Sequence, residues 1–95
     1  MKAILKKVNC NPEVVDIKNS LDAMQEIVGG YIEVVYKEFN NETIAIVCDE
    51  EGRLKGKQHN CFINGTSFVG DIIIVGVDGE EFCDLDVDNI ELIRE

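Results

Sequence analysis

Several residue types and patterns are scarce or absent in this 95-residue chain, and their absence narrows what the protein can be. Tryptophan is missing, and the only aromatic residues besides one histidine are two tyrosines and four phenylalanines, so Val, Ile and Leu must fill the interior. No apolar run approaches the roughly 20 residues that cross a bilayer. Residues 1–7 lack the long apolar region of a signal peptide. We therefore expect a cytoplasmic protein with no membrane partner.

Cysteine and histidine are too few and too scattered to predict a metal site. None of the four cysteines forms a Cys-x-x-Cys pair, and the chain contains one histidine. A zinc site would need ligands from distant segments, so free thiols in a reducing compartment are the better interpretation. We expect no metal and no cofactor. The cysteines are Cys10, Cys48, Cys61 and Cys83.

Motifs for catalysis and for phosphate loops are also missing. The glycines at positions 65, 70, 76 and 79 match neither the Walker nor the dinucleotide-binding pattern. No serine or cysteine lies in a nucleophile motif around His59, so this histidine lacks what a general base requires. The sequence predicts no catalytic residues and no enzyme activity.

Acidic residues are abundant. Nineteen acidic against nine basic residues give a net charge of -10, which repels long nucleic acids. Residues 78–95 hold eight carboxylates and one arginine. Such a face can imitate a row of phosphates, or it can simply be a solvated surface that keeps the protein soluble.

One short segment has the opposite charge. Arg53, Lys55, Lys57 and His59 alternate with uncharged residues. If residues 53–60 were extended, all four basic side chains would lie on one face. A positive strip of this kind suits a small anion such as a nucleotide phosphate. The alternative is an edge strand that its lysines protect from aggregation.

Other polar residues complete a hypothetical ligand site. Asn60 offers a donor and an acceptor to a base, the carboxylates at 49–51 can bond sugar hydroxyls, and Tyr31 can stack on a flat ligand. Glu33 is expected on the same strand face as Tyr31. The predicted ligand-binding residues are Tyr31, Glu33, Arg53, Lys55, Lys57, His59 and Asn60.

The order of elements predicts a single α+β domain over residues 1–95. We expect an antiparallel sheet of about five to seven strands, one main helix over about 20–29, and a short C-terminal helix beginning at Asp86 or Asp88. Asn19 or Ser20 is the helix cap, and Gly29-Gly30 ends the helix. The predicted strands are 2–8, 13–17, 31–39, 43–48, 72–75 and 81–84, with turns at 40–41 and 78–79. The segment 62–68 contains a further tight turn at Asn64-Gly65.

Several of these segments together resemble a known family. They are Gly29-Gly30-Tyr31-Ile32-Glu33, the turn at 49–54, Asn60, and the glycine-flanked apolar strand 70–76. The chain is similar over nearly its whole length to the domain of unknown function 3846 family, common in phages, plasmids and integrative elements. The resemblance implies a mobile-element origin and a host bacterial cytoplasm, and no enzyme activity. Family members often have apolar residues and proline where this chain has 55–59, so the basic strip is particular to this protein.

Two functional hypotheses follow. In the first, a phage-encoded homo-oligomer sequesters a small nucleotide-type immune signal without turnover. In the second, an acidic protein mimics DNA and occupies the DNA-binding groove of a host defence or regulatory protein, without binding nucleic acid itself. The basic strip favours the first, and the acidic C-terminal segment favours the second.

Overall fold

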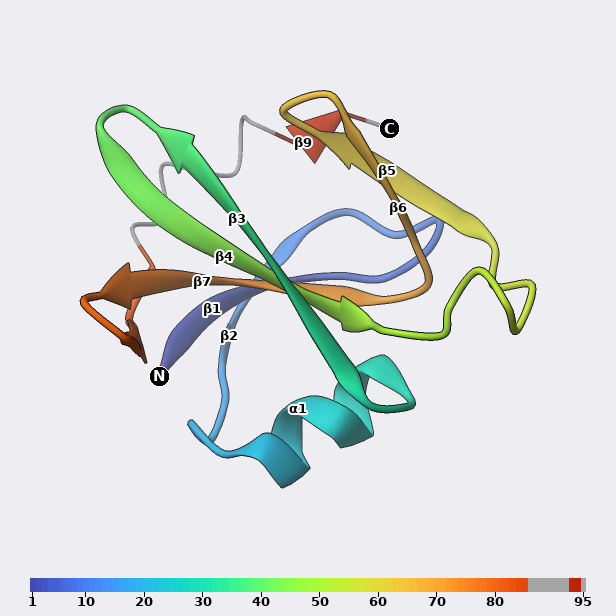
Figure 1. Cartoon of the computed structure of the whole chain (residues 1–95), viewed down its shortest axis with the longest axis horizontal. Coiled ribbons are helices and arrows are strands. Elements are labelled where there is room, and N and C mark those ends of the chain that lie inside the picture. Colours follow the sequence, from blue (N-terminus) through green and yellow to red (C-terminus); the bar gives the residue numbers. More distant parts are fainter. Residues whose placement is uncertain (86–92, 95) are drawn as a thin grey trace.

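The fold is built around a six-stranded antiparallel sheet, described here from a computed structural model over residues 1–85 and 93–94. The main path of this large sheet is β2-β1-β7-β4-β3, and β8 pairs with the C-terminal end of β7 (Figure 1). Its strands are β1 (Lys2–Lys6), β2 (Glu13–Asp16), β3 (Ile32–Phe39), β4 (Glu42–Asp49), β7 (Ile72–Asp78) and β8 (Glu81–Cys83). The predicted antiparallel sheet is therefore confirmed.

A second, smaller sheet has the strand order β6-β5-β9. Its strands are β5 (His59–Ile63), β6 (Thr66–Val69) and β9 (Ile93–Arg94). Because Ile93 pairs with Ile63, these C-terminal residues are a strand. The rest of the predicted C-terminal helix falls on residues 86–92, which lie outside the described part of the chain.

The helix in the described part of the chain, α1 (Leu21–Val28), begins and ends where its capping residues predict. The Ser20 hydroxyl accepts a hydrogen bond from the Ala23 N–H at 3.2 Å. Gly29 closes the helix in the left-handed conformation with φ 82°, which a glycine adopts without steric cost. One eight-residue helix beside nine strands makes the described chain mostly β.

Asparagines shape two of the hairpins. Asn40 and Asn41 both have positive φ, 53° and 64°, and link β3 to β4 in a two-residue turn. Asn64 and Gly65, with φ 50° and 84°, do the same between β5 and β6. These primed turns match the twist of the flanking strands, and asparagine and glycine tolerate their dihedrals best. Both turn predictions are confirmed.

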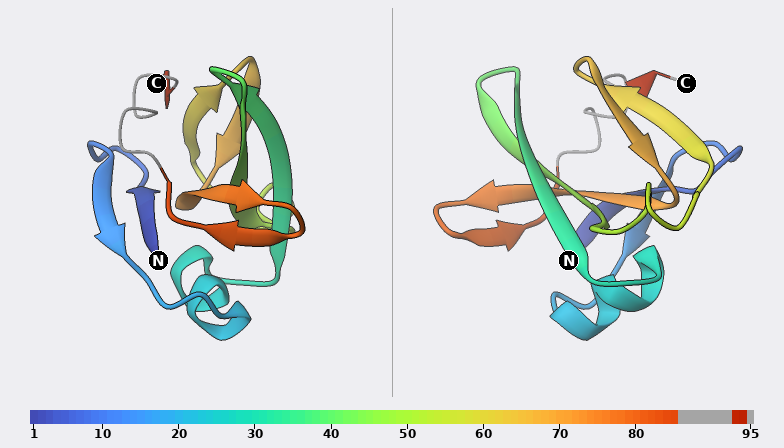
Figure 2. Two further views of the ribbon diagram at one scale, coloured as in Figure 1. Left: turned by 90° about the vertical axis from the view of Figure 1, so that its left-hand side faces the viewer. Right: turned by 45° about the vertical axis from the view of Figure 1, so that its right-hand side comes forward.

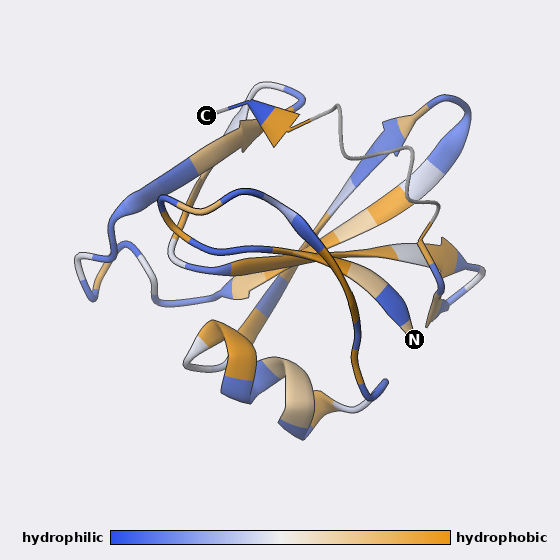
Figure 3. Ribbon diagram, turned by 180° about the vertical axis from the view of Figure 1, so that it is seen from behind, coloured by the Kyte–Doolittle hydropathy of each residue, from blue (hydrophilic) through white to orange (hydrophobic). Residues whose placement is uncertain are grey.

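Two apolar layers lie on opposite faces of the large sheet. On one face α1 packs with Met24 and Val28 against alternate residues of β4 and β7, including Val47 and Ile73. On the other face the small sheet contributes its buried side chains. The helix and the small sheet thus sandwich the large sheet (Figure 2), and β7, buried on both faces over Ile72–Val75, is among its most apolar strands (Figure 3). No helix in residues 1–85 and 93–94 is long and apolar enough to cross a membrane.

The predicted extended conformation of residues 53–60 is wrong. Residues 50–56 form consecutive turns, and β5 begins only at His59. Backbone hydrogen bonds from Lys55 N to Glu51 O and from Lys57 N to Gly52 O close these turns, and Gly56 has φ 70°. Because side chains alternate between faces only in an extended chain, the four basic groups do not form one strip.

Candidate functional site

Asp49, the last residue of β4, holds two lysines of the following loop. Its side chain is 1% exposed, and Oδ2 lies 2.8 Å from Lys55 Nζ and 2.7 Å from Lys57 Nζ. Its other oxygen, Oδ1, accepts the Glu51 N–H at 2.9 Å. We call Asp49, Lys55 and Lys57 the Asp49 cluster. Both carboxylate oxygens of Asp49 are therefore engaged by protein groups.

Both lysines of the Asp49 cluster also cap the C-terminus of α1. Lys57 Nζ donates to Val28 O at 2.7 Å, and Lys55 Nζ donates to Gly29 O at 3.1 Å. The last turn of α1 has no basic residue of its own, so these loop lysines supply the positive charge that a helix C-terminus favours. An ammonium has three N–H groups, so each lysine keeps one beyond these contacts.

The ionisation of Asp49 follows from these contacts. Burial alone would raise its pKa, because a dry environment penalises the charged carboxylate. The hydrogen bonds from Lys55 and Lys57, and then the one from the Glu51 N–H, outweigh burial and hold the pKa of Asp49 well below its usual range. Asp49 is thus ionised throughout the neutral pH range.

Gly30 provides the space in which the Asp49 cluster forms. A Cβ atom at this position would lie 2.6 Å from Lys55 Nζ and 2.7 Å from Asp49 Oδ1. Gly29 also approaches the cluster, although less closely, because its Cβ would lie 3.1 Å from Lys57 Nζ. The Gly29-Gly30 pair therefore ends the helix, as predicted, and also lets two ammonium groups approach it.

A groove between β3 and β6 contains two of the predicted ligand-binding residues, Glu33 and Arg53. We call it the edge groove; its volume is about 410 Å³. Arg53 lies across it from β3 and is anchored there, because Nη2 donates to Ser67 O at 2.8 Å. The lining residues are Glu33, Val35, Cys48, Asp49, Glu50, Arg53, Leu54, Thr66, Ser67, Phe68 and Val69.

The Cys48 thiol belongs to the edge groove but is held protonated. Burial raises the pKa of Cys48 to about 11, and the neighbouring Glu33 carboxylate adds to this rise. The thiol donates weakly to Glu33, with Sγ 3.6 Å from the carbonyl oxygen and 3.8 Å from Oε1. A thiol with a raised pKa is a poor nucleophile.

The remaining predicted residues lie in different surroundings. Tyr31 directly precedes β3 on the side of Glu33 and is 69% exposed, although it does not line the groove. His59 is also exposed; its Nδ1 lies 3.3 Å from Ser67 Oγ, and its ring centroid lies 4.9 Å from that of Phe62. Neither Tyr31 nor His59 is therefore among the residues that line the groove.

Asn60 is separated from the other predicted residues because it lies in the interior, 5% exposed. Its Nδ2 donates to Lys6 O and to Gly70 O, both at 2.7 Å, and so joins β1 to the segment before β7. Its Oδ1 has no hydrogen-bond partner in the described part of the molecule. The contacts of Asn60 are those of an internal clamp.

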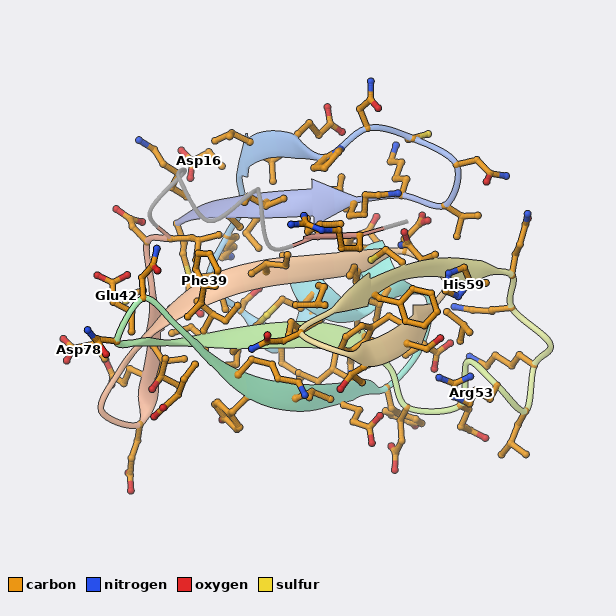
Figure 4. The ribbon with its side chains drawn as sticks, turned by 90° about the horizontal axis from the view of Figure 1, so that it is seen from above. Asp16, Phe39, Glu42, Arg53, His59 and Asp78 are labelled. Atoms are coloured by element: carbon orange, nitrogen blue, oxygen red, sulfur yellow. The ribbon has the colours of Figure 1, made fainter. Side chains whose placement is uncertain are left out.

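Acidic side chains gather at the end of the molecule remote from the edge groove. Figure 4 shows Asp16, Glu42 and Asp78 at one end and Arg53 and His59 at the other. A second hollow of about 680 Å³ at the acidic end is lined by Glu42, Glu80 and Asp84 among others. Within residues 1–85 and 93–94, no three His, Cys, Asp or Glu side chains are placed to hold a metal ion.

Sequence reasoning missed the Asp49 cluster. The signal was present in Gly29-Gly30, since two successive glycines are more than a helix end requires, and in a single carboxylate ending an apolar strand. Neither feature identifies which residues meet in the Asp49 cluster. Asp49 is six and eight residues from its two lysines, and the helix carbonyls that these lysines bond are 26 and 29 residues away in sequence.

Comparison with known proteins gives a family but no characterised relative. The family model described as "Domain of unknown function (DUF3846)" matches residues 1–95, the whole chain, so the protein belongs to this family. No curated protein and no solved structure matches it.

Proposed function

We propose that this member of the domain of unknown function 3846 family is a non-catalytic binding protein that sequesters a small nucleotide-type immune signal in the edge groove. The supporting observation is that Glu33 and Arg53, predicted as ligand contacts from two separate segments, line one groove. Its volume of about 410 Å³ falls within the range of small-molecule sites. The mobile-element origin that the family resemblance implies motivates the immune-signal class.

The composition of the groove suits a nucleotide. Val35, Phe68 and Val69 offer an apolar wall to a base, and the hydroxyls of Thr66 and Ser67 are within the same lining. The Arg53 guanidinium, of which only Nη2 is engaged by Ser67, keeps other N–H groups for a phosphate. The Glu33 carboxylate can accept a hydrogen bond from an amino group of a base.

Charge restricts the kind of nucleotide. Arg53 is the one cation in the lining, and it is accompanied by the exposed carboxylates of Glu33 and Glu50. A triphosphate would meet more repulsion than one guanidinium offsets. A ligand with one or two phosphodiester charges, such as a cyclic nucleotide, fits better. The raised pKa of the Cys48 thiol, the sulfur nearest the groove, supports binding without nucleophilic turnover.

Arg53→Gln is expected to weaken nucleotide binding about tenfold or more, because a charged hydrogen bond to phosphate contributes about 1.5–3 kcal/mol. Glu33→Gln should change the preference among bases while retaining phosphate binding. A panel of cyclic mono- and dinucleotides, titrated by calorimetry and inspected by native mass spectrometry, measures both effects. Lys18→Gln removes an exposed cation remote from the groove and serves as the matched control. No binding anywhere in the panel, or equal losses in Arg53→Gln and Lys18→Gln, would contradict the proposal.

A second candidate function is DNA mimicry, and the acidic end favours it. Glu42, Glu80 and Asp84 lie around one hollow there, at the end of the molecule away from Arg53 and His59. Because mimicry depends on charge, the protein should release duplex DNA from a DNA-binding protein at low salt and lose this effect as salt rises. The triple variant Glu42→Gln, Glu80→Gln, Asp84→Asn should abolish release in a fluorescence anisotropy assay, whereas Arg53→Gln should leave it intact. Failure of the native protein to release DNA at low salt would exclude this candidate.

A further inference from the structure

The border of the large sheet formed by β3 is its longest open edge. Within residues 1–85 and 93–94, β3 pairs with β4 on one side and with no strand on the other. It has eight residues, whereas β2 at the opposite border has four (Figure 4 shows β3 in teal along the lower border of the sheet). A long edge strand with unpaired backbone groups is where another strand can add.

The pairing with β4 determines which backbone groups of β3 point outward. The Glu50 N–H donates to Tyr31 O at 2.8 Å, and antiparallel ladders alternate between bonded and non-bonded pairs. Residues 31, 33, 35, 37 and 39 therefore bond to β4, and the backbone groups of 32, 34, 36 and 38 face outward. The side chain of Asn64 agrees with this assignment, because its Nδ2 donates to the outward Glu38 O at 3.1 Å. The N–H and C=O groups of Val34 and Tyr36 are left at the open edge.

The side chains at this edge are complementary to their own copy in reverse order. If two β3 strands pair antiparallel with Val35 opposite the partner's Val35, Glu33 lies opposite the partner's Lys37. Val34 then lies opposite the partner's Tyr36. In the single chain the Tyr36 side chain is 58% exposed, so it is available for this contact. Two-fold symmetry repeats both contacts. Opposite charges and aromatic–β-branched pairs are the cross-strand combinations that stabilise sheets.

Neighbouring registers lack this complementarity. Shifting the partner by one pairing step in either direction places Val35 or Phe39 opposite Glu33 and leaves Lys37 without an acidic residue opposite it. A further step in one direction places Glu33 opposite the partner's Glu33, which is repulsive. The backbone does not distinguish these registers, because each of them pairs outward-facing residues of β3 with outward-facing residues of the partner. The charged pair Glu33 and Lys37 therefore selects the register centred on Val35.

We propose that two copies of this chain associate through β3, antiparallel, with Glu33 opposite the partner's Lys37 on both sides of the two-fold axis. The two large sheets then form one continuous sheet, and the small sheets lie on the same face of it. The proposal rests on the open edge of β3 and not on a ligand, although Glu33 also lines the edge groove. It assigns the occupant of the β3 edge as a second copy of the same protein.

Charge reversal at β3 tests the proposal. Sedimentation velocity of the native chain should show a dimer, and Lys37→Glu or Glu33→Lys alone should weaken it about tenfold or more, because two attractive pairs become repulsive. Mixing the two variants should restore the dimer, because each partner then carries one sign at both positions. Lys18→Glu, a reversal remote from the edge, should leave the dimer unchanged. Circular dichroism confirms that each variant is folded.

Hydrogen exchange gives a second measurement, because it detects the pairing of backbone amides directly. The Val34 and Tyr36 amides should be protected in the dimer and should exchange rapidly in either reversed variant. A native chain that is monomeric at every concentration tested would overturn the proposal. So would a dimer that both reversals leave intact, or a mixture of the two variants that stays monomeric.

Discussion

Replacing Asp49 by asparagine is expected to lower the free energy of unfolding by about 2–4 kcal/mol, because it leaves two lysine ammonium groups around a buried neutral side chain. Both lysines of the Asp49 cluster lose their anionic partner. The neutral amide oxygen of asparagine accepts hydrogen bonds from two ammonium groups less strongly than the carboxylate oxygen does. The lysines are partly exposed, 41% and 25% at their side chains, so water relieves part of the loss. Urea unfolding followed by circular dichroism, at one fixed protein concentration, measures the difference.

The same substitution should also change how stability depends on pH. The pKa of Asp49 is lowered in the folded protein from its ordinary value of 3.8, so the unfolded chain binds the proton first as the pH falls. Its stabilising contribution is therefore complete above the ordinary pKa and is lost as the pH falls toward the lowered one. Between about pH 5 and pH 3, the native protein should lose more stability than Asp49→Asn. Equal slopes would mean that the Asp49 cluster does not hold its carboxylate ionised.

Glu50→Gln is the control for this experiment. Glu50 is the next carboxylate in the chain and is exposed, so its neutralisation should change stability by no more than about 0.5 kcal/mol. A loss as large as that of Asp49→Asn would indicate a general effect of charge on this acidic protein. The comparison therefore separates the effect of the buried position of Asp49 from the effect of removing one negative charge.

Gly30→Ala is expected to destabilise the protein by about 1–3 kcal/mol, because it overpacks the Asp49 cluster. The new Cβ would lie 2.6 Å from Lys55 Nζ and 2.7 Å from Asp49 Oδ1. The lysine terminus can move, but the carboxylate oxygen is held by the Glu51 N–H. The cost should fall to near zero in an Asp49→Ala background, where the obstructing oxygen is gone. A double-mutant cycle by urea unfolding measures this coupling.

Gly56→Ala shows what a glycine substitution costs without a collision. Its Cβ would meet nothing within 4 Å, but its φ of 70° is left-handed, so we expect a loss of about 1–2 kcal/mol from backbone strain alone. This loss should be the same with and without Asp49. If the cost of Gly30→Ala is also independent of Asp49, the steric explanation for Gly30 is wrong.

The parts of the fold that could be predicted from the sequence are those determined by local chemistry. Ser20 and Gly29 delimit α1 because each satisfies groups at a helix end. Asn40-Asn41 and Asn64-Gly65 tolerate the positive φ of tight hairpins, so both turns were correctly predicted. The unbroken apolar run Ile72–Val75 predicted a fully buried strand, and β7 is buried on both faces over these residues.

The basic strip shows where such reasoning fails. Alternating side chains indicate a shared face only if the backbone is extended, and here local hydrogen bonds compete with extension. The Asp49 carboxylate accepts the Glu51 N–H and Gly56 turns left-handed, so the segment coils and its lysines point to α1. That destination is a tertiary contact, which no spacing within the segment reveals. Glu33 and Arg53, both predicted as ligand-binding residues, line one groove, although the prediction for Arg53 assumed the wrong backbone conformation.

The internal clamp formed by Asn60 makes its position sensitive to the number of donors and not to size. The amide supplies two N–H groups to the carbonyls of Lys6, in β1, and of Gly70, in the segment between β6 and β7. Aspartate has nearly the same shape but offers acceptors only, so it would face two carbonyl oxygens with like partial charge. Leucine has a similar volume but would remove the hydrogen bond that Asn60 Nδ2 donates to each carbonyl. We therefore expect Asn60 to be replaceable only by side chains that can give two hydrogens from one atom.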